Sequence, residues 1–395
     1  MPLKRNTRDL QTARRYLDDA RKRSARQCGR VADHRSDAVT PSRAQRLLAV
    51  LEKREARARS YLEAIEGWHR KHPHARVPKA MKQRLMNRKA SGGKKPDKAA
   101  EWDKSVRAAL AKQFAGAPNY GSYVTGLWEK YLALGLPNAH FVSEICVGKN
   151  ETIAQRVWEM MLAAHFSALG FTMTSPDDGP DLRIEHDGRV VWIEAICPTA
   201  VGIPEQWMRP LDAGEFAVGD VPHNEILLRW TAAIKEKSEK LAKYREKGIV
   251  RAEDSFVIAV NGGLLGRMPL NEGISQMPYA FEAVYPAGPT TLEIDRKTHR
   301  VVRSFKSLRL QVENANGEPV PTTAFMDRGN AAVSAVLAYS SDRSEAPILT
   351  ADIVHNHLAT KPVDLGLLGP DNVEWGKVGE DGGEIEVGKL PAIST

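Results

Sequence analysis

Cysteine is scarce in this chain, and long apolar runs are missing from it. The 395 residues include only three cysteines, Cys28, Cys146 and Cys197, whose odd number and wide spacing exclude a disulfide framework and a zinc motif. No run of eighteen apolar residues occurs, so we expect no membrane span and no membrane partner. The opening Met-Pro-Leu-Lys-Arg lacks the apolar core of a secretory signal. Together these features predict a cytoplasmic protein.

Acidic residues are few in the first hundred positions. That segment has 28 lysines and arginines against 10 aspartates and glutamates, whereas the whole chain carries a net charge of +8 and its remainder about −10. Such a basic segment suits phosphate contacts and counterion release. The residues expected to contact nucleic acid are Arg21, Lys22, Arg23, Lys53, Arg54, Arg57, Arg84, Arg88, Lys89, Lys94 and Lys95. A solvated helical arm, or a hairpin that docks on a partner, is the alternative interpretation.

Aromatic residues are also sparse in this basic segment, which disfavours stacking on single-stranded bases. Helical periodicity predicts helices over residues 7–26 and 42–68, and the Gly- and Lys-rich stretch at 91–96 predicts a linker. The expected divisions are a basic all-helical arm (1–98), a helical lead-in (99–150), an α/β core with a strand-rich second half (151–360) and a tail (361–395), in which residues 379–395 are expected to be loosely ordered.

One stretch combines a hairpin pattern with carboxylates. Two β-favouring runs flank Asp187-Gly188, which predicts a two-residue type I′ turn. That turn places Asp181 opposite Glu194, with Cβ atoms about 4.5–5.5 Å apart. Two facing carboxylates, one inside an apolar strand, require compensation, and Mg²⁺ is a natural candidate because one or two carboxylates usually hold it. The alternative is a solvated edge from which Glu194 projects into water.

The order of these features resembles the PD-(D/E)xK nuclease superfamily. A helix carrying an acid precedes Gly179-Pro180-Asp181, and an apolar strand then leads to Glu194. The resemblance covers about residues 151–260 and implies a restriction-endonuclease-like mixed sheet flanked by helices. It further implies that Asp181 and Glu194 bind Mg²⁺ or Mn²⁺, and that Glu159 on the preceding helix supplies a third acid.

The lysine that this resemblance implies two residues after Glu194 is missing, because Ile196 stands there. Either a neighbouring helix supplies the amine, or the fold has lost cleavage. A helix predicted over residues 224–247 places Lys237 on its apolar stripe, where an ammonium needs an acidic partner unless its stem snorkels to the surface. Three other lysines are expected to lie off that stripe: Lys235, Lys240 and Lys243.

The remaining pattern predicts an α/β order. Before the hairpin we expect helices over residues 102–114, 123–134 and 151–169, with short strands over 141–147 and 172–174. The first of these strands contains Glu144, a weaker candidate for an active-site acid than Glu159. After the hairpin we expect strands over 255–260, 290–295, 299–305, 308–313 and 348–354, a helix over 330–338, and completion of the same sheet by this later part.

These features together favour a Mg²⁺-dependent endonuclease acting on DNA, with RNA and a homodimeric state left open. In that interpretation Asp181 and Glu194 hold the metal, and Lys237 positions water or stabilises the transition state. The resemblance implies a prokaryotic restriction or phage-defence setting. The alternative is an inactive nuclease-like fold that binds nucleic acid or a partner through the basic arm, with Ile196 marking the lost activity.

Overall fold

The computed structural model describes residues 98–186, 188–209, 220–266, 272–346, 348–363, 367–368, 373–378 and 385–389, the last two segments as backbone. These residues belong to one compact unit, Asp97–Thr395, of mixed α/β structure. The two helices predicted for the basic arm, and every residue there expected to contact nucleic acid, lie outside the described residues. No helix in the described part of the chain is long and apolar enough to cross a membrane.

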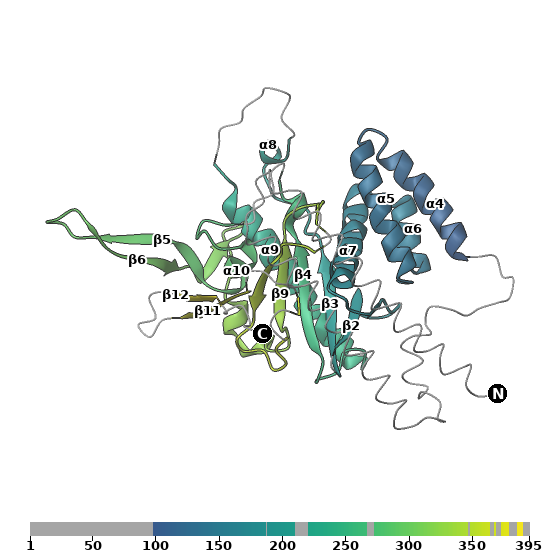
Figure 1. The fold of residues 1–395 in the computed structure, drawn as a ribbon. Coiled ribbons are helices and arrows are strands. Elements are labelled where there is room, and N and C mark those ends of the chain that lie inside the picture. Colours follow the sequence, from purple (N-terminus) through teal and green to yellow (C-terminus); the bar gives the residue numbers. More distant parts are fainter. Residues whose placement is uncertain are drawn as a thin grey trace, which may run out of the picture. The chain divides into compact units, whose positions relative to one another are not determined.

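The described chain opens with a group of helices (Figure 1). These are α4 (Lys98–Gln113), α5 (Pro118–Ala133) and α6 (Ala139–Val147). The first two confirm the predicted helices, but α6 shows that the strand expected over residues 141–147, with Glu144, was wrong. Asn138 caps α6 by accepting a 2.8 Å hydrogen bond from the N–H of Phe141. Phe141, Val142 and Ile145 are buried at a spacing that forms one face of a helix.

An open mixed sheet forms the centre of the unit (Figure 1). Among the described residues eight strands join it, in the order β1-β2-β3-β4-β9-β10-β11-β12. Their bounds are β1 Met173–Thr174, β2 Leu182–His186, β3 Arg189–Ile196, β4 Ser255–Asn261, β9 Ala335–Tyr339, β10 Asp352–His355, β11 Val373–Val378 and β12 Ile385–Lys389. β3, β4 and β9 run parallel, and β2 pairs antiparallel with β3. The predicted mixed sheet flanked by helices is therefore confirmed.

Helices cover both faces of this sheet (Figure 1). α7 (Asn150–Ala168) packs on one face with α4 to α6, while α9 (His223–Glu246) and α10 (Tyr279–Val284) pack on the other. In β4, Val257 joins the core on the α7 side and its neighbour Phe256 joins the core on the α9 side. All seven residues of β4 are buried, as expected for a central strand that is covered twice.

The later part of the chain departs from the prediction in four places. The helix expected over residues 330–338 was wrong, because a short 3₁₀ turn, η4 (Arg328–Asn330), is followed there by strand β9. The strand expected over 348–354 is shorter in the structure, where β10 begins only at Asp352. The hairpins do not complete the main sheet: β5 (Ala287–Ile294) pairs with β6 (Val301–Leu308), and β7 (Gln311–Glu313) with β8 (Pro319–Pro321), as separate sheets. The segment expected as a tail contributes β11 and β12 to the main sheet, and β12 lies in the stretch over 379–395 that was expected to be loosely ordered. Three short elements complete the description: α8 (Glu205–Met208), η2 (Gly262–Leu264) and η3 (Ala324–Met326).

Candidate active site

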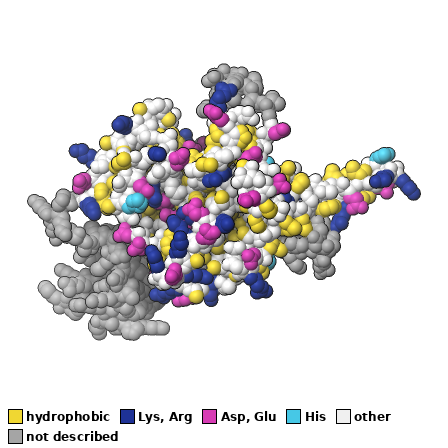
Figure 2. All heavy atoms as spheres, turned by 180° about the vertical axis from the view of Figure 1, so that it is seen from behind, with side chains coloured by type: hydrophobic (Ala, Val, Ile, Leu, Met, Phe, Trp, Pro, Cys, Tyr) yellow, Lys and Arg dark blue, Asp and Glu magenta, His cyan; other side chains and the backbone are white. Residues whose placement is uncertain are grey.

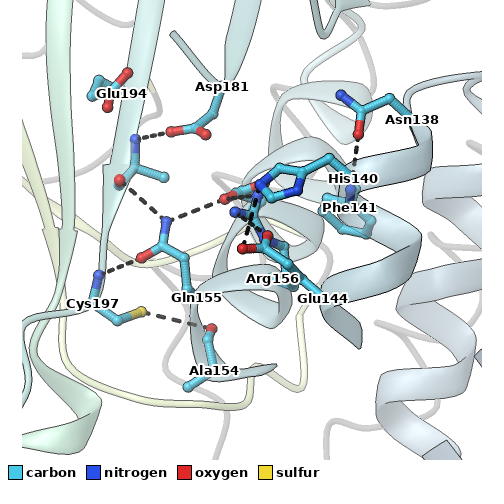
Figure 3. A network of polar contacts seen from close by, with 12 residues as sticks. Asn138, His140, Phe141, Glu144, Ala154, Gln155, Arg156, Asp181, Glu194 and Cys197 are labelled. Atoms are coloured by element: carbon cyan, nitrogen blue, oxygen red, sulfur yellow. Dashed lines mark hydrogen bonds and ion pairs between the residues drawn. The ribbon is translucent and has the colours of Figure 1, made fainter. Parts of the chain in front are cut away.

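The β2–β3 hairpin brings Asp181 and Glu194 to the end of the hairpin opposite its turn. His186 pairs with Arg189, which is the predicted register. Asp181 directly precedes β2, and its Oδ2 accepts a 2.7 Å hydrogen bond from the backbone N–H of Ala195, next to Glu194 (Figure 3). The two carboxylates therefore lie close enough for the charge of Glu194 to affect the pKa of Asp181.

Glu194 is buried on the α9 side of the sheet. Its residue is 1% exposed, and the alternation along β3 places it on the same side as Trp192, which joins the core beneath α9. The solvated-edge interpretation was therefore wrong for Glu194. Lys237 Nζ donates to Oε1 of Glu194 at 2.9 Å, and the hydroxyl of Tyr244 donates to Oε2 at 3.2 Å. The buried carboxylate thus has protein donors on both of its oxygens.

Lys237 lies on the buried face of α9, as its position on the predicted apolar stripe indicates. It faces the core rather than snorkelling to solvent, and it is 7% exposed. Lys240 was expected to lie off the stripe, but its Nζ also reaches Oε1 of Glu194, at 3.0 Å, from a side chain that is 44% exposed. Lys240 and Tyr244 are residues that sequence reasoning missed as partners of Glu194. They follow Lys237 by three and seven positions, a spacing that places all three on one helix face.

Asp181 is only partly compensated by its surroundings. The pKa of Asp181 is raised to about 6, mainly because the carboxyl is buried and next because of the charge of Glu194. The N–H of Ala195 and the cations Lys237 and Arg156 oppose this rise but do not cancel it. Asp181 is nevertheless partly accessible to solvent. The Asp181 carboxyl therefore keeps a raised pKa although one N–H donor and two cations act against the rise.

A third acid lies behind Asp181, on α7. Glu159 is 2% exposed, and Arg156 Nη1 donates a hydrogen bond to each of its carboxylate oxygens, at 2.7 Å each. Burial, followed by the charge of Asp181, raises the pKa of Glu159 well above its usual value. Arg156 also places Nη2 2.6 Å from Oε2 of Glu144, so one guanidinium bridges two carboxylates, as its position beside Glu144 in Figure 3 illustrates. The structure thus brings the predicted Glu159 to the site, with Glu144 beyond it.

Gln155 ties α7 to the end of β3 and was not predicted. Its Oε1 accepts the backbone N–H of Cys197 at 2.8 Å, and its Nε2 donates at 3.2 Å to the backbone oxygen of Ala195 and to Oε1 of Glu159 (Figure 3). The available signal was its position one helical turn before Glu159. These contacts fix the backbone segment that carries Glu194 and binds Asp181.

The donor set fits a hard divalent cation. Among the described residues, the contacts of Asp181 leave its Oδ1 as an acceptor, and Oε2 of Glu194 meets a neutral hydroxyl whereas Oε1 takes both ammonium groups. Burial is the largest cause of the raised pKa values of Asp181 and Glu159, and the charge of a neighbouring carboxylate is the second. Within the described ranges no group of three or more His, Cys, Asp or Glu side chains converges as metal ligands. Two carboxylates are nevertheless the usual protein contribution to a Mg²⁺ site.

Comparison with known proteins adds no further identification. No protein-family model matches the chain, and neither a curated protein nor a solved structure matches it significantly. Interpretation of the site therefore depends on the geometry of Asp181, Glu194 and Lys237 and on their surroundings.

Proposed function

We propose that this protein is a metal-dependent nuclease that hydrolyses DNA phosphodiester bonds on a restriction-endonuclease-like core of the PD-(D/E)xK type. The observation that carries the proposal is the contact between Lys237 and Glu194 beside Asp181. An amine from α9 reaches the carboxylate pair from another element, which compensates for Ile196 at the position where the resemblance implies lysine.

Asp181 and Glu194 would hold Mg²⁺ or Mn²⁺. When bound, such an ion lowers the pKa of a water molecule and neutralises charge on the scissile phosphate. Lys237 pairs with Glu194 in its buried position and places positive charge where the scissile phosphate would gain negative charge in the transition state. Lys240, which is half exposed, can reach a phosphate oxygen from the solvent side. Glu159, whose pKa burial raises well above its usual value, lies beside these carboxylates and is held there by Arg156.

The basic segment over residues 1–98 supports DNA as the substrate. Its excess of lysine and arginine suits sequence-independent contact with phosphates, which adds affinity and positions the duplex without reading bases. RNA is the alternative polyanion. A restriction or phage-defence role in a prokaryotic cytoplasm is consistent with such an enzyme.

A second candidate function has its own supporting observation. Both oxygens of Glu194 already have protein donors, so Lys237, Lys240 and Tyr244 satisfy this carboxylate without a metal. A nuclease-like fold that lost cleavage and binds nucleic acid or a partner through its basic arm would have such a self-contained ion-pair network.

Cleavage assays separate the two candidates. Supercoiled and linear DNA are incubated with the purified chain and Mg²⁺ or Mn²⁺, at low and moderate salt, alongside Asp181→Ala, Glu194→Ala and Lys237→Ala. Lys235→Ala is the matched control, because Lys235 lies on the same helix with its side chain 78% exposed. Cutting that is lost in the three site variants and kept in the control supports the nuclease. Cutting that persists in the acid variants overturns the site, and DNA binding without any cutting favours the inactive fold.

A further inference from the structure

The β5–β6 ribbon is a second feature of the molecule that the candidate active site does not use. Figure 1 shows it projecting from the body on the side away from α4 to α6. Its two antiparallel strands have eight residues each, which corresponds to about 26 Å of extended chain. Apart from the residues at its root, most of the ribbon is exposed.

The charge of the ribbon is opposite to that of the body. Residues 287–308 contain five lysines and arginines against two acids, a net of +3, although residues 101–395 together carry about −10. Figure 2 shows Lys, Arg and His side chains gathered at the free end of the ribbon. Arg296, Lys297 and Arg300 are all exposed there. The described part of the chain therefore presents a basic projection on an acidic body.

The turn that carries these cations has a defined geometry. Asp295 Oδ1 accepts the N–H groups of Lys297 and Thr298, at 3.0 and 2.6 Å, and Asp295 N donates to the backbone oxygen of Arg300 at 2.9 Å. His299 has φ +54°, which closes the turn in the left-handed region. The three cations are thus presented by a turn that is fixed by its own hydrogen bonds.

The root of the ribbon is anchored to the body. Ala287 is fully buried in the core beneath α9 and α10. At Gly288 an added Cβ would lie 2.8 Å from Ser307 Oγ and 2.9 Å from its backbone oxygen, so the two strands approach too closely there for a side chain. Lys306 Nζ donates to Thr290 Oγ1 at 2.7 Å across the strands. The ribbon is therefore held firmly where it leaves the body.

We infer that the β5–β6 ribbon binds duplex DNA by entering a groove, with Arg296, Lys297 and Arg300 on the phosphates. The major groove is about 12 Å wide and admits a two-stranded ribbon. The exposed apolar side chains behind the tip, Leu292, Ile294, Val301 and Val302, suit contact with base edges such as thymine methyl groups. The inference rests on the proposed function for its choice of DNA, and it adds a contact separate from the basic arm and from the candidate active site.

The test measures binding of the full chain to a fluorescent 30-base-pair duplex in EDTA, which prevents metal-dependent cleavage, at several salt concentrations. The variant is Arg296→Ala with Lys297→Ala and Arg300→Ala. The matched control is Lys104→Ala with Lys112→Ala and Lys130→Ala, which removes three exposed cations from α4 and α5. Log K falls as log salt rises, and we expect the ribbon variant to make this negative slope shallower by about 3, at roughly one per phosphate contact. The control should change that slope by less than about one.

Two results would overturn the inference. In the first, the ribbon variant and the control give the same slope. In the second, the salt slope of the cation variant stays at the wild-type value, and sedimentation shows that Leu292→Ser with Val302→Ser converts a dimer to a monomer. That result would identify the ribbon as a self-association arm. A shallower slope in the ribbon variant, without DNA cleavage under any condition, keeps the ribbon inference and removes the nuclease proposal. DNA cleavage together with an unchanged slope keeps the nuclease proposal and removes the ribbon inference.

Discussion

Lys237 Nζ lies 2.9 Å from Oε1 of Glu194, and both residues are almost completely excluded from solvent. Removing one partner of a buried ion pair leaves an uncompensated charge and costs about 3–5 kcal/mol of stability. Lys240 contacts the same oxygen and remains after such a change, so it offsets part of that loss. The pair therefore has a structural role as well as the proposed catalytic one, and the two roles can be separated by experiment.

We predict that Lys237→Met lowers the free energy of unfolding by about 2–4 kcal/mol, whereas Lys240→Ala, at a partly exposed position, lowers it by less than about 1 kcal/mol. Urea denaturation measures both. Adding Glu194→Gln to Lys237→Met should restore part of the stability, because the unpaired charge is removed, while DNA cleavage stays absent. A double variant that regains both stability and cleavage would contradict a catalytic role for this pair.

The raised pKa of Asp181 predicts a pH dependence of stability. Between the usual value of 3.8 and about 6, the folded state binds more protons at this carboxyl than the unfolded state does. Its contribution therefore makes the free energy of unfolding fall as pH rises through this window, and the full penalty is present above about pH 6. Asp181→Asn should abolish this dependence and stabilise the fold at pH 7.

Asp178→Asn is the control for that measurement, because Asp178 lies three residues earlier and is exposed. Urea denaturation of the two variants and the wild type between pH 4 and pH 8 gives the comparison. The Asp178 variant should follow the wild-type curve. If the Asp181 variant also follows it, the carboxyl does not carry the expected proton between pH 4 and pH 6.

Divalent cations should stabilise the fold through the same carboxyl. A ligand that binds only the folded state adds about 2.7 kcal/mol at one hundred times its Kd, so Mg²⁺ or Mn²⁺ should raise the Tm at pH 7.5. The rise should shrink below pH 6, where Asp181 takes up a proton, and it should vanish in Asp181→Asn. A thermal-shift titration measures it, with Na⁺ at matched ionic strength as the control. An equal rise in Asp181→Asn would place the cation elsewhere.

Local patterns predicted the candidate site better than they predicted the elements around it. The turn at Asp187-Gly188 was enough to place Asp181 opposite Glu194, because a two-residue turn determines every cross-strand pair. Position on an apolar stripe was enough to place Lys237. Lys240 was missed because its long stem crosses from the edge of the stripe to Glu194, a reach that residue spacing alone does not express.

The wrong elements have a different cause. Residues 141–147 form a short apolar run, and such a run does not by itself distinguish a strand from a buried helix. Its helix is specified by the Asn138 cap and by packing against α4 and α5. The alanine-rich run at 330–338 favoured a helix locally, but a place between β4 and β10 makes Ala335–Tyr339 a strand. Tertiary contacts override propensity in both cases.

The last prediction concerns Gln155, which holds the N–H of Cys197 and the backbone oxygen of Ala195. Gln155→Leu leaves both groups without this partner and should lower the free energy of unfolding by about 1–3 kcal/mol. Gln113→Leu, which removes an exposed 2.7 Å contact to Asn150, should have a smaller effect. Both are measured by urea denaturation.

Gln155→Glu provides a sharper version of this test. The new carboxyl keeps an acceptor for the N–H of Cys197, but its charged form faces the backbone oxygen of Ala195 and the carboxylate of Glu159. Its pKa in the folded state should therefore lie above that in the unfolded state, so the variant should lose stability as pH rises from 5 to 8. Gln155→Leu carries no such charge and should lose a similar amount at both pH values. Parallel pH profiles for the two variants would mean that Gln155 does not lie within reach of the acid cluster.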